Sequence, residues 1–318
     1  MVNWRSANPT SVHCIDWISM TLAKLSFEHP NSFPDFSDAR RLFLFSDYSS
    51  CNQVALYSFL ITSEKNLALF NSAISSWRYS QNLNRRFDYK KLGDRVKSRL
   101  LHKFLDHVDA VPALMLTISI DNRIGGLLTG SRFVRDAYKA VIPFDERVPD
   151  RIVEQVFRCA AFAAILVNGL CSPGQDLVWM SDDDDMFAND NLAVRVKGIV
   201  ETIFDRVTTM PMGSMGYTIA SKAKSHSGAQ DLLSVCDLSC GYYVSHLRET
   251  PKLIVPVPRY KDAVLGWWLS RHNLPMRKVY FALSRNTLGG PSLDRKVLIS
   301  PYAQPTGIIR AGSQRRPF

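Results

Sequence analysis

The chain has 318 residues, of which 46% are hydrophobic and 21% are charged, and its formal net charge is +10. This composition is typical of a globular protein and excludes a disordered chain, a collagen-like repeat and a small disulfide-stabilised domain. A chain of this length buries about 75% of the surface that its unfolded form exposes, so its core needs no metal ion and a metal site would serve function.

The first 40 residues predict a short helix over 16–25 and an irregular, proline-containing segment, which we interpret as a preface to the core. Two apolar strands follow, over 41–47 and 53–62. Only a handful of polar residues separates them. They therefore predict an antiparallel hairpin, because a parallel crossover needs about a dozen residues or more.

The middle of the chain alternates helical and strand patterns. Helices are expected over 69–79, 89–107, 132–141, 152–170, 191–207 and 231–247. Strands are expected over 113–120, 177–180 and 216–220. A strand pair followed by alternating helices and strands predicts an α/β fold with a mixed sheet flanked by helices.

The helix over 152–170 is the longest apolar one, but polar residues such as Glu154, Arg158 and Asn168 interrupt it. It predicts a buried core helix and no membrane span. The N-terminus lacks the charged-then-apolar pattern of a signal peptide. The six cysteines show no Cys-x-x-Cys pair and no zinc-type spacing with histidine. We expect reduced, mostly buried thiols, including Cys236 and Cys240 on one helix face, and a cytoplasmic protein.

The end of the chain is strongly basic. Residues 251–318 contain twelve Lys and Arg against two Asp, and so carry the whole net charge. We expect this basic C-terminal segment to bind nucleic acid, DNA or RNA, through salt-dependent phosphate contacts. Trp267 and Trp268 are candidate base-stacking residues, although tryptophans in an apolar helix more often pack in the core. The alternative is a basic surface that only keeps the protein soluble.

Three regions follow from these patterns. They are the preface over 1–40, a core over 41–250, and a basic C-terminal part over 251–318. The last part combines a helix over 262–271 and a strand over 277–283, which predict a subdomain packed on the main sheet, with a terminal tail.

Two predicted strands end in aspartate, at Asp47 and at Asp182. Strand ends are where ligands bind in open α/β sheets, and carboxylates from neighbouring strands hold Mg²⁺ or Mn²⁺ beside a phosphate. In an extended chain Asp182 and Asp184 face one side, and Asp183 and Asp185 face the other. The pair of Asp182 and Asp184 is therefore the better chelator. The alternative is a solvated turn or the N-cap of the next helix.

A third aspartate, Asp237, lies in the late helix among apolar residues that surround it on nearly every side. Burying such a carboxylate costs free energy unless a cation meets it. The sequence does not decide which of two cations would neutralise Asp237. One is a metal ion, and the other is an arginine that forms a salt bridge with Asp237.

These features resemble a widespread prokaryotic family of uncharacterised RNase H-like proteins over residues 41–243. In that family the first strand typically ends in Asp-Glu-Ser-Gly, and a late helix contains a Leu-Gln-x-Ala-Asp-Leu-type motif. Here the first motif reads Asp47-Tyr-Ser-Ser and the late helix reads Leu-Leu-Ser-Val-Cys-Asp-Leu-Ser-Cys-Gly. The sequence keeps the first acid and Asp237 but has Tyr48 in place of the Glu and Ser50 in place of the Gly.

The resemblance implies an RNase H-like mixed sheet whose acidic cluster binds one or two Mg²⁺ or Mn²⁺ ions and hydrolyses a phosphodiester of nucleic acid. Asp47 would bridge the metals, and Asp182, Asp184 and Asp237 would complete their coordination. Asp121, at another strand end, is a weaker candidate because the residues after it predict an ordinary turn.

Two other functions remain open at this point. The missing Glu after Asp47 leaves room for a nucleic-acid-binding or scaffold protein with an incomplete site. The motif Asp182-x-Asp184 after an apolar strand is also typical of GT-A glycosyltransferases, in which it holds Mn²⁺ on a nucleotide sugar. That function explains neither Asp237 nor the basic C-terminal segment.

Overall fold

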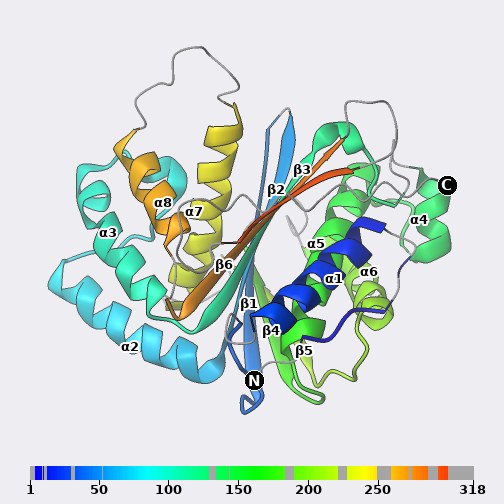
Figure 1. The fold of residues 1–318 in the computed structure, drawn as a ribbon, viewed down its shortest axis with the longest axis horizontal. Coiled ribbons are helices and arrows are strands. Elements are labelled where there is room, and N and C mark those ends of the chain that lie inside the picture. The colour runs from blue at the N-terminus through cyan, green and yellow to red at the C-terminus, as the bar shows by residue number, and fades with distance from the viewer. Residues whose placement is uncertain are drawn as a thin grey trace.

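The computed structural model describes residues 4–8, 10, 13–29, 33–51, 53–128, 134–142, 144–182, 190–220, 228–248, 259–271, 274–285 and 293–299. A mixed sheet of seven strands runs through its centre in the order β5-β4-β1-β2-β3-β6-β7 (Figure 1). The strands are β1 (Arg41–Ser50), β2 (Val54–Ser63), β3 (Ala113–Asp121), β4 (Asp176–Ser181), β5 (Met215–Ile219), β6 (Met276–Arg285) and β7 (Leu293–Ile299).

The first three strands form an antiparallel meander, which confirms the predicted hairpin. On one side β4 pairs parallel with β1, and β5 pairs parallel with β4. On the other side β6 pairs parallel with β3, and β7 pairs antiparallel with β6. The expectation that β1 ends at Asp47 is wrong. The strand continues through Ser50 because Ser49 and Ser50 remain paired with Leu56 and Ala55 of β2.

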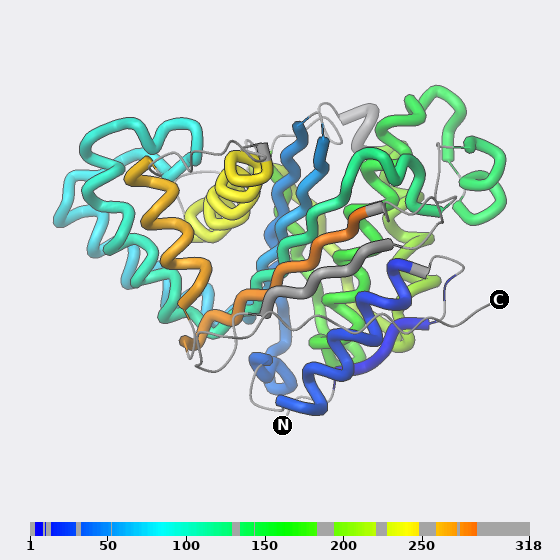
Figure 2. The backbone as a smooth tube through the Cα atoms, turned by 45° about the horizontal axis from the view of Figure 1, so that its top comes forward, coloured from blue at the N-terminus to red at the C-terminus, as the bar shows by residue number. Residues whose placement is uncertain are grey.

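Helices cover both faces of the sheet (Figures 1 and 2). One layer contains α1 (His13–Glu28), α4 (Arg135–Val141), α5 (Asp150–Leu170) and α6 (Asp190–Val207). The other contains α2 (Glu64–Ser80), α3 (Arg95–Asp109), α7 (Gly228–Arg248) and α8 (Tyr260–Ser270). The short 3-10 helices η1 (Tyr89–Lys91) and η2 (Asn122–Ile124) lie in the connections. The structure therefore confirms an α/β fold with a mixed, helix-flanked sheet.

Two apolar cores separate these layers, because side chains alternate along each strand. Leu42 and Leu44 of β1 pack into the core beneath α1, α5 and α6. Phe45, with Phe43 at its edge, packs into the core beneath α2, α3, α7 and α8. Helix α5 is long and apolar enough to cross a membrane, but 94% of its most apolar stretch is buried inside the fold. That burial is consistent with the core helix of a soluble protein.

The C-terminal part contributes directly to the sheet. The sequence predicted a subdomain packed on the sheet, whereas β6 forms backbone pairs with β3 from Met276 to Leu283. Its Val279 and Phe281 enter the core beneath α5, and Met276 enters the opposite core. Helix α8 packs against α3 and α7. This part of the chain is therefore continuous with the central sheet.

Candidate functional site

The register of β1 and β4 brings two of the predicted aspartates together. Phe45 and Met180 are partners on these parallel strands, and both pack into the core beneath α7. Asp47 and Asp182 each come two residues later, so both carboxylates face α7. The backbone N–H of Asp182 donates to the carbonyl of Ser46 at 3.2 Å, which extends the pairing to this point. The two acids are therefore neighbours at adjacent strands.

Helix α7 places the third aspartate over them. The thiol of Cys236 donates to the carbonyl of Phe45 at 3.6 Å, and the thiol of Cys240 donates to the carbonyl of Asp47 at 3.7 Å. Asp237 lies on the same turn. Burial, followed by the charge of Asp47, raises the pKa of both thiols. They remain protonated at neutral pH and pack in the core, as expected.

Asp237 is only partly exposed, and its carboxylate accepts the backbone N–H of Tyr89 at 2.7 Å. Burial, the largest cause, and the negative charges of Asp182 and Asp88 together raise the pKa of Asp237 to about 6, against the lowering effects of the Tyr89 hydrogen bond and the Arg86 charge. These interactions show that Asp237 and Asp182 share one electrostatic environment.

The sequence analysis missed Arg86, which lies between α2 and η1. Its guanidinium binds both carboxylate oxygens of Asp182, at 2.8 and 3.2 Å, and also pairs with Asp88. Burial alone would lower the pKa of Arg86, but the bonds to Asp182 and Asp88 raise it overall, so this cation remains charged. The sequence analysis considered an arginine salt bridge to Asp237. In the structure this arginine, Arg86, binds Asp182 instead.

A buried ion pair fixes the start of this segment. Arg78 of α2 binds Asp231 of α7 through two bonds, one of them 2.8 Å long. The same guanidinium donates to the carbonyls of Leu83 and Arg85 at 3.1 and 3.0 Å. It therefore joins α2, α7 and the chain that leads to Arg86.

Tyr89 packs directly on α7. A Cβ added at Gly241 would overlap the Tyr89 ring, so only glycine allows this approach. Lys261 of α8 lies 3.8 Å from the centroid of the ring and donates to the Tyr89 carbonyl at 3.0 Å. Arg259 donates to the Tyr89 hydroxyl at 3.2 Å. The first turn of α8 thus holds η1 beside Asp237.

The structure does not show the other predicted site residues at this site. Asp183, Asp184 and Asp185 lie outside the described residues. Asp121 accepts the backbone N–H of Arg123 at 2.9 Å and pairs with its guanidinium, so it caps a local turn. Among the residues that the structure describes, no group of three or more His, Cys, Asp or Glu is arranged to hold a metal ion.

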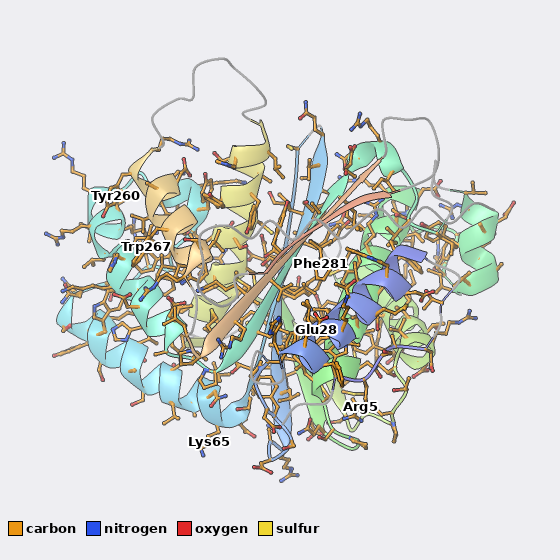
Figure 3. All side chains as sticks on the ribbon, viewed as in Figure 1. Arg5, Glu28, Lys65, Tyr260, Trp267 and Phe281 are labelled. Carbon is orange, nitrogen blue, oxygen red and sulfur yellow. The ribbon has the colours of Figure 1, made fainter. Side chains whose placement is uncertain are left out.

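Several cations of the basic C-terminal segment bind inside the protein. Buried Lys278 donates to Asp109 at 2.7 Å, and Arg271 contacts Asp106 and Asp109 at 2.6 and 3.1 Å. Trp268 is buried and donates to Asp109 at 2.8 Å. Trp267 is 47% exposed on α8 (Figure 3), and its ring stacks on His102 and contacts the guanidinium of Arg271. The last arginines, Arg310, Arg315 and Arg316, lie outside the described residues.

Comparisons with protein-family models, with curated proteins and with solved structures found no match to this chain.

Proposed function

We propose that this protein is a divalent-metal-dependent nuclease with an RNase H-like core. The proposal rests on Asp47 of β1, Asp182 at the end of β4 and Asp237 of α7, whose charges all act on the buried thiol of Cys236, although the described residues form no ready group of metal ligands. The three-stranded antiparallel meander followed by parallel β4 and β5 supports the RNase H-like assignment. We also propose a cytoplasmic location, which the mostly buried cysteine thiols support.

The charge balance of the site suits a divalent cation. Carboxylate oxygens are the ligands that Mg²⁺ and Mn²⁺ prefer. Asp47, Asp182 and Asp237 would hold the ion, and a cation would offset both the burial of the Asp237 charge, which is the main cause of its raised pKa, and the repulsion from Asp182. When bound, the metal would lower the pKa of the attacking water and neutralise the leaving oxygen. Asp237 must lose its proton to serve as a ligand, so activity should increase as the pH rises through about 6.

Arg86 favours a second candidate, a nucleic-acid-binding protein with an incomplete site. Its guanidinium already engages both oxygens of Asp182, and Tyr48 stands where the family has Glu. The glycosyltransferase alternative gains no support from the described residues, because Asp184, which it requires, lies outside them.

Cleavage assays separate these candidates. Fluorescently labelled single-stranded and duplex DNA and RNA are incubated with the intact chain in Mn²⁺, Mg²⁺ or EDTA. We expect metal-dependent cleavage that falls more than about 100-fold in Asp47→Asn, a larger loss than outer-shell substitutions at metal sites give. Asp121→Asn is the matched control, because Asp121 is an aspartate of strand β3 in the same sheet but binds Arg123, and this variant should keep its activity. Binding without cleavage in any metal would favour the incomplete site.

A further inference from the structure

The segment from Arg85 to Arg99 is the most concentrated basic stretch around the acid site. It contains seven Lys and Arg against two Asp, all within fifteen residues. Two of its members contact the site directly. Arg86 binds Asp182, and the N–H of Tyr89 binds Asp237. The sequence analysis overlooked this segment because its charge is balanced by acids elsewhere in the first 250 residues.

The backbone of this segment is held in place by buried or half-buried cations. Arg78 binds the carbonyls of Leu83 and Arg85. Lys97, itself buried, donates to the carbonyl of Arg86 at 2.6 Å. Lys261 donates to the carbonyl of Tyr89. A backbone fixed at the carbonyls of Arg85, Arg86 and Tyr89 presents its exposed side chains in a preorganised arrangement.

The exposed cations of the segment are not used for folding in the same way. Arg85, Lys90, Arg95 and Arg99 are exposed, and their side chains form no salt bridge within the part of the chain that the structure describes. Arg95 lies in the first turn of α3, where the helix dipole disfavours a cation. Stability therefore gives no reason for a positive charge at Arg95.

We propose that this segment, with Arg259 and Lys261 of α8, binds the phosphate backbone of a nucleic-acid strand and directs it to the acid site. The inference rests on the proposed function and names the surface that its substrate contacts. Fixed cations around an acidic centre suit a phosphodiester strand, because the cations attract the phosphates on either side of the centre, where the three carboxylates would hold the metal that the proposed function requires. An acidic peptide lacks a phosphodiester to place there.

The test is a binding experiment in EDTA, so that it is independent of cleavage. The variant Arg85→Gln, Lys90→Gln, Arg95→Gln removes three exposed cations of the segment. Its control is Lys24→Gln, Lys65→Gln, Lys197→Gln, which removes three exposed cations of α1, α2 and α6. Lys65 lies at the start of α2, away from the segment that follows the helix (Figure 3). Both variants lose the same net charge.

Binding of a labelled 25-nucleotide single strand is measured from about 50 to 200 mM salt by anisotropy. The segment variant should bind about tenfold or more weakly at the lowest salt, and its slope of log affinity against log salt should be shallower by roughly 2, because each lost phosphate contact contributes roughly 0.7. The control should retain most of the affinity and slope of the original chain.

The results that would contradict the proposed surface differ from those that would contradict the proposed nuclease activity. Equal binding by the two variants, or no binding by the original chain, would overturn the proposed surface. An equal loss of affinity for polyglutamate would also overturn it, since the surface would then be a general polyanion site. If the segment variant alone loses nucleic-acid binding but the original chain cleaves nothing in Mn²⁺, the surface stands and the proposed nuclease activity fails.

Discussion

The two faces of the sheet differ in the charged groups that they bury. Beneath α1, α5 and α6 the core is apolar, and its buried ionic cluster, Glu154 with Arg158 and Tyr138, holds the loop at Gly125 and Leu127. Beneath α2, α3, α7 and α8, the ion pairs Arg78–Asp231 and Lys278–Asp109 are buried on the same face of the sheet as the acid site.

Buried ion pairs rarely stabilise a fold more than apolar packing would. The structure describes more of them beneath α7 than beneath α5, where Glu154 pairs with Arg158, and this difference agrees with the site proposed there. The face beneath α5 is thus mainly apolar, whereas the face beneath α7 carries Asp47, Asp182 and Asp237 together with two buried ion pairs.

Breaking the Arg78–Asp231 pair should have the largest effect on stability. Asp231→Ala leaves a buried guanidinium without its carboxylate partner, and we expect a loss of about 3–5 kcal/mol in the free energy of unfolding, measured by urea denaturation. The double variant Arg78→Met, Asp231→Leu should recover most of that loss. It should still bind nucleic acid less tightly, because the carbonyls of Leu83 and Arg85 lose their anchor.

Recovery of stability together with unchanged nucleic-acid binding would contradict this account. It would mean that the ion pair serves the fold alone, as the cluster around Glu154 does on the other face.

Substitutions of two helical glycines, one on each face of the sheet, should change the free energy of unfolding by a smaller amount. Gly241→Ala on α7 places a methyl group into the Tyr89 ring, whereas Gly198→Ala on α6 meets nothing within 4 Å. Overpacking should lower the free energy of unfolding of Gly241→Ala by about 1–3 kcal/mol. Better helix propensity should raise that of Gly198→Ala by about 0.5–1 kcal/mol.

Urea denaturation of both glycine variants, with nucleic-acid binding measured alongside, checks this pair. If the two substitutions have the same sign, or if Gly241→Ala binds nucleic acid as the original chain does, then Tyr89 is not held by α7 in the way described.

The sequence predicted the features that depend on local pattern. Alternation and spacing indicated the hairpin of β1 and β2 and the buried helix α5. An acid in an apolar element marked Asp47 and Asp237. The strand end at Asp47 was misplaced because its true extent depends on pairing with β2.

Contacts between distant residues could not be derived in the same way. Arg86 and Asp182 are 96 residues apart, and Arg78 and Asp231 are 153 apart. Nothing local distinguishes these two arginines among 39 Lys and Arg residues. For the same reason, the charge of Lys278 was assigned to a binding surface, although Asp109 neutralises it inside the fold.

The central claim is that Asp237 belongs to a crowded acidic centre that takes up a divalent cation. Its pKa, raised to about 6 from the usual 3.8, means that the folded protein binds this proton more tightly than the unfolded chain. No stability is lost to this group below about pH 4. The loss grows as the pH rises from about 4 to 6 and is complete above that range. Allowing for the partial exposure of Asp237, we expect this loss in the free energy of unfolding to reach about 1–2 kcal/mol.

The most direct test measures the free energy of unfolding from pH 4 to 8, with and without Mn²⁺, for the original chain and for Asp237→Asn. Without metal, Asp237→Asn should become the more stable protein above about pH 6. Mn²⁺ should stabilise the original chain there, increasingly with pH, and should stabilise Asp237→Asn much less. Identical pH profiles for the two proteins, or an equal effect of Mn²⁺ on both, would contradict the claim that these carboxylates form one metal-binding centre.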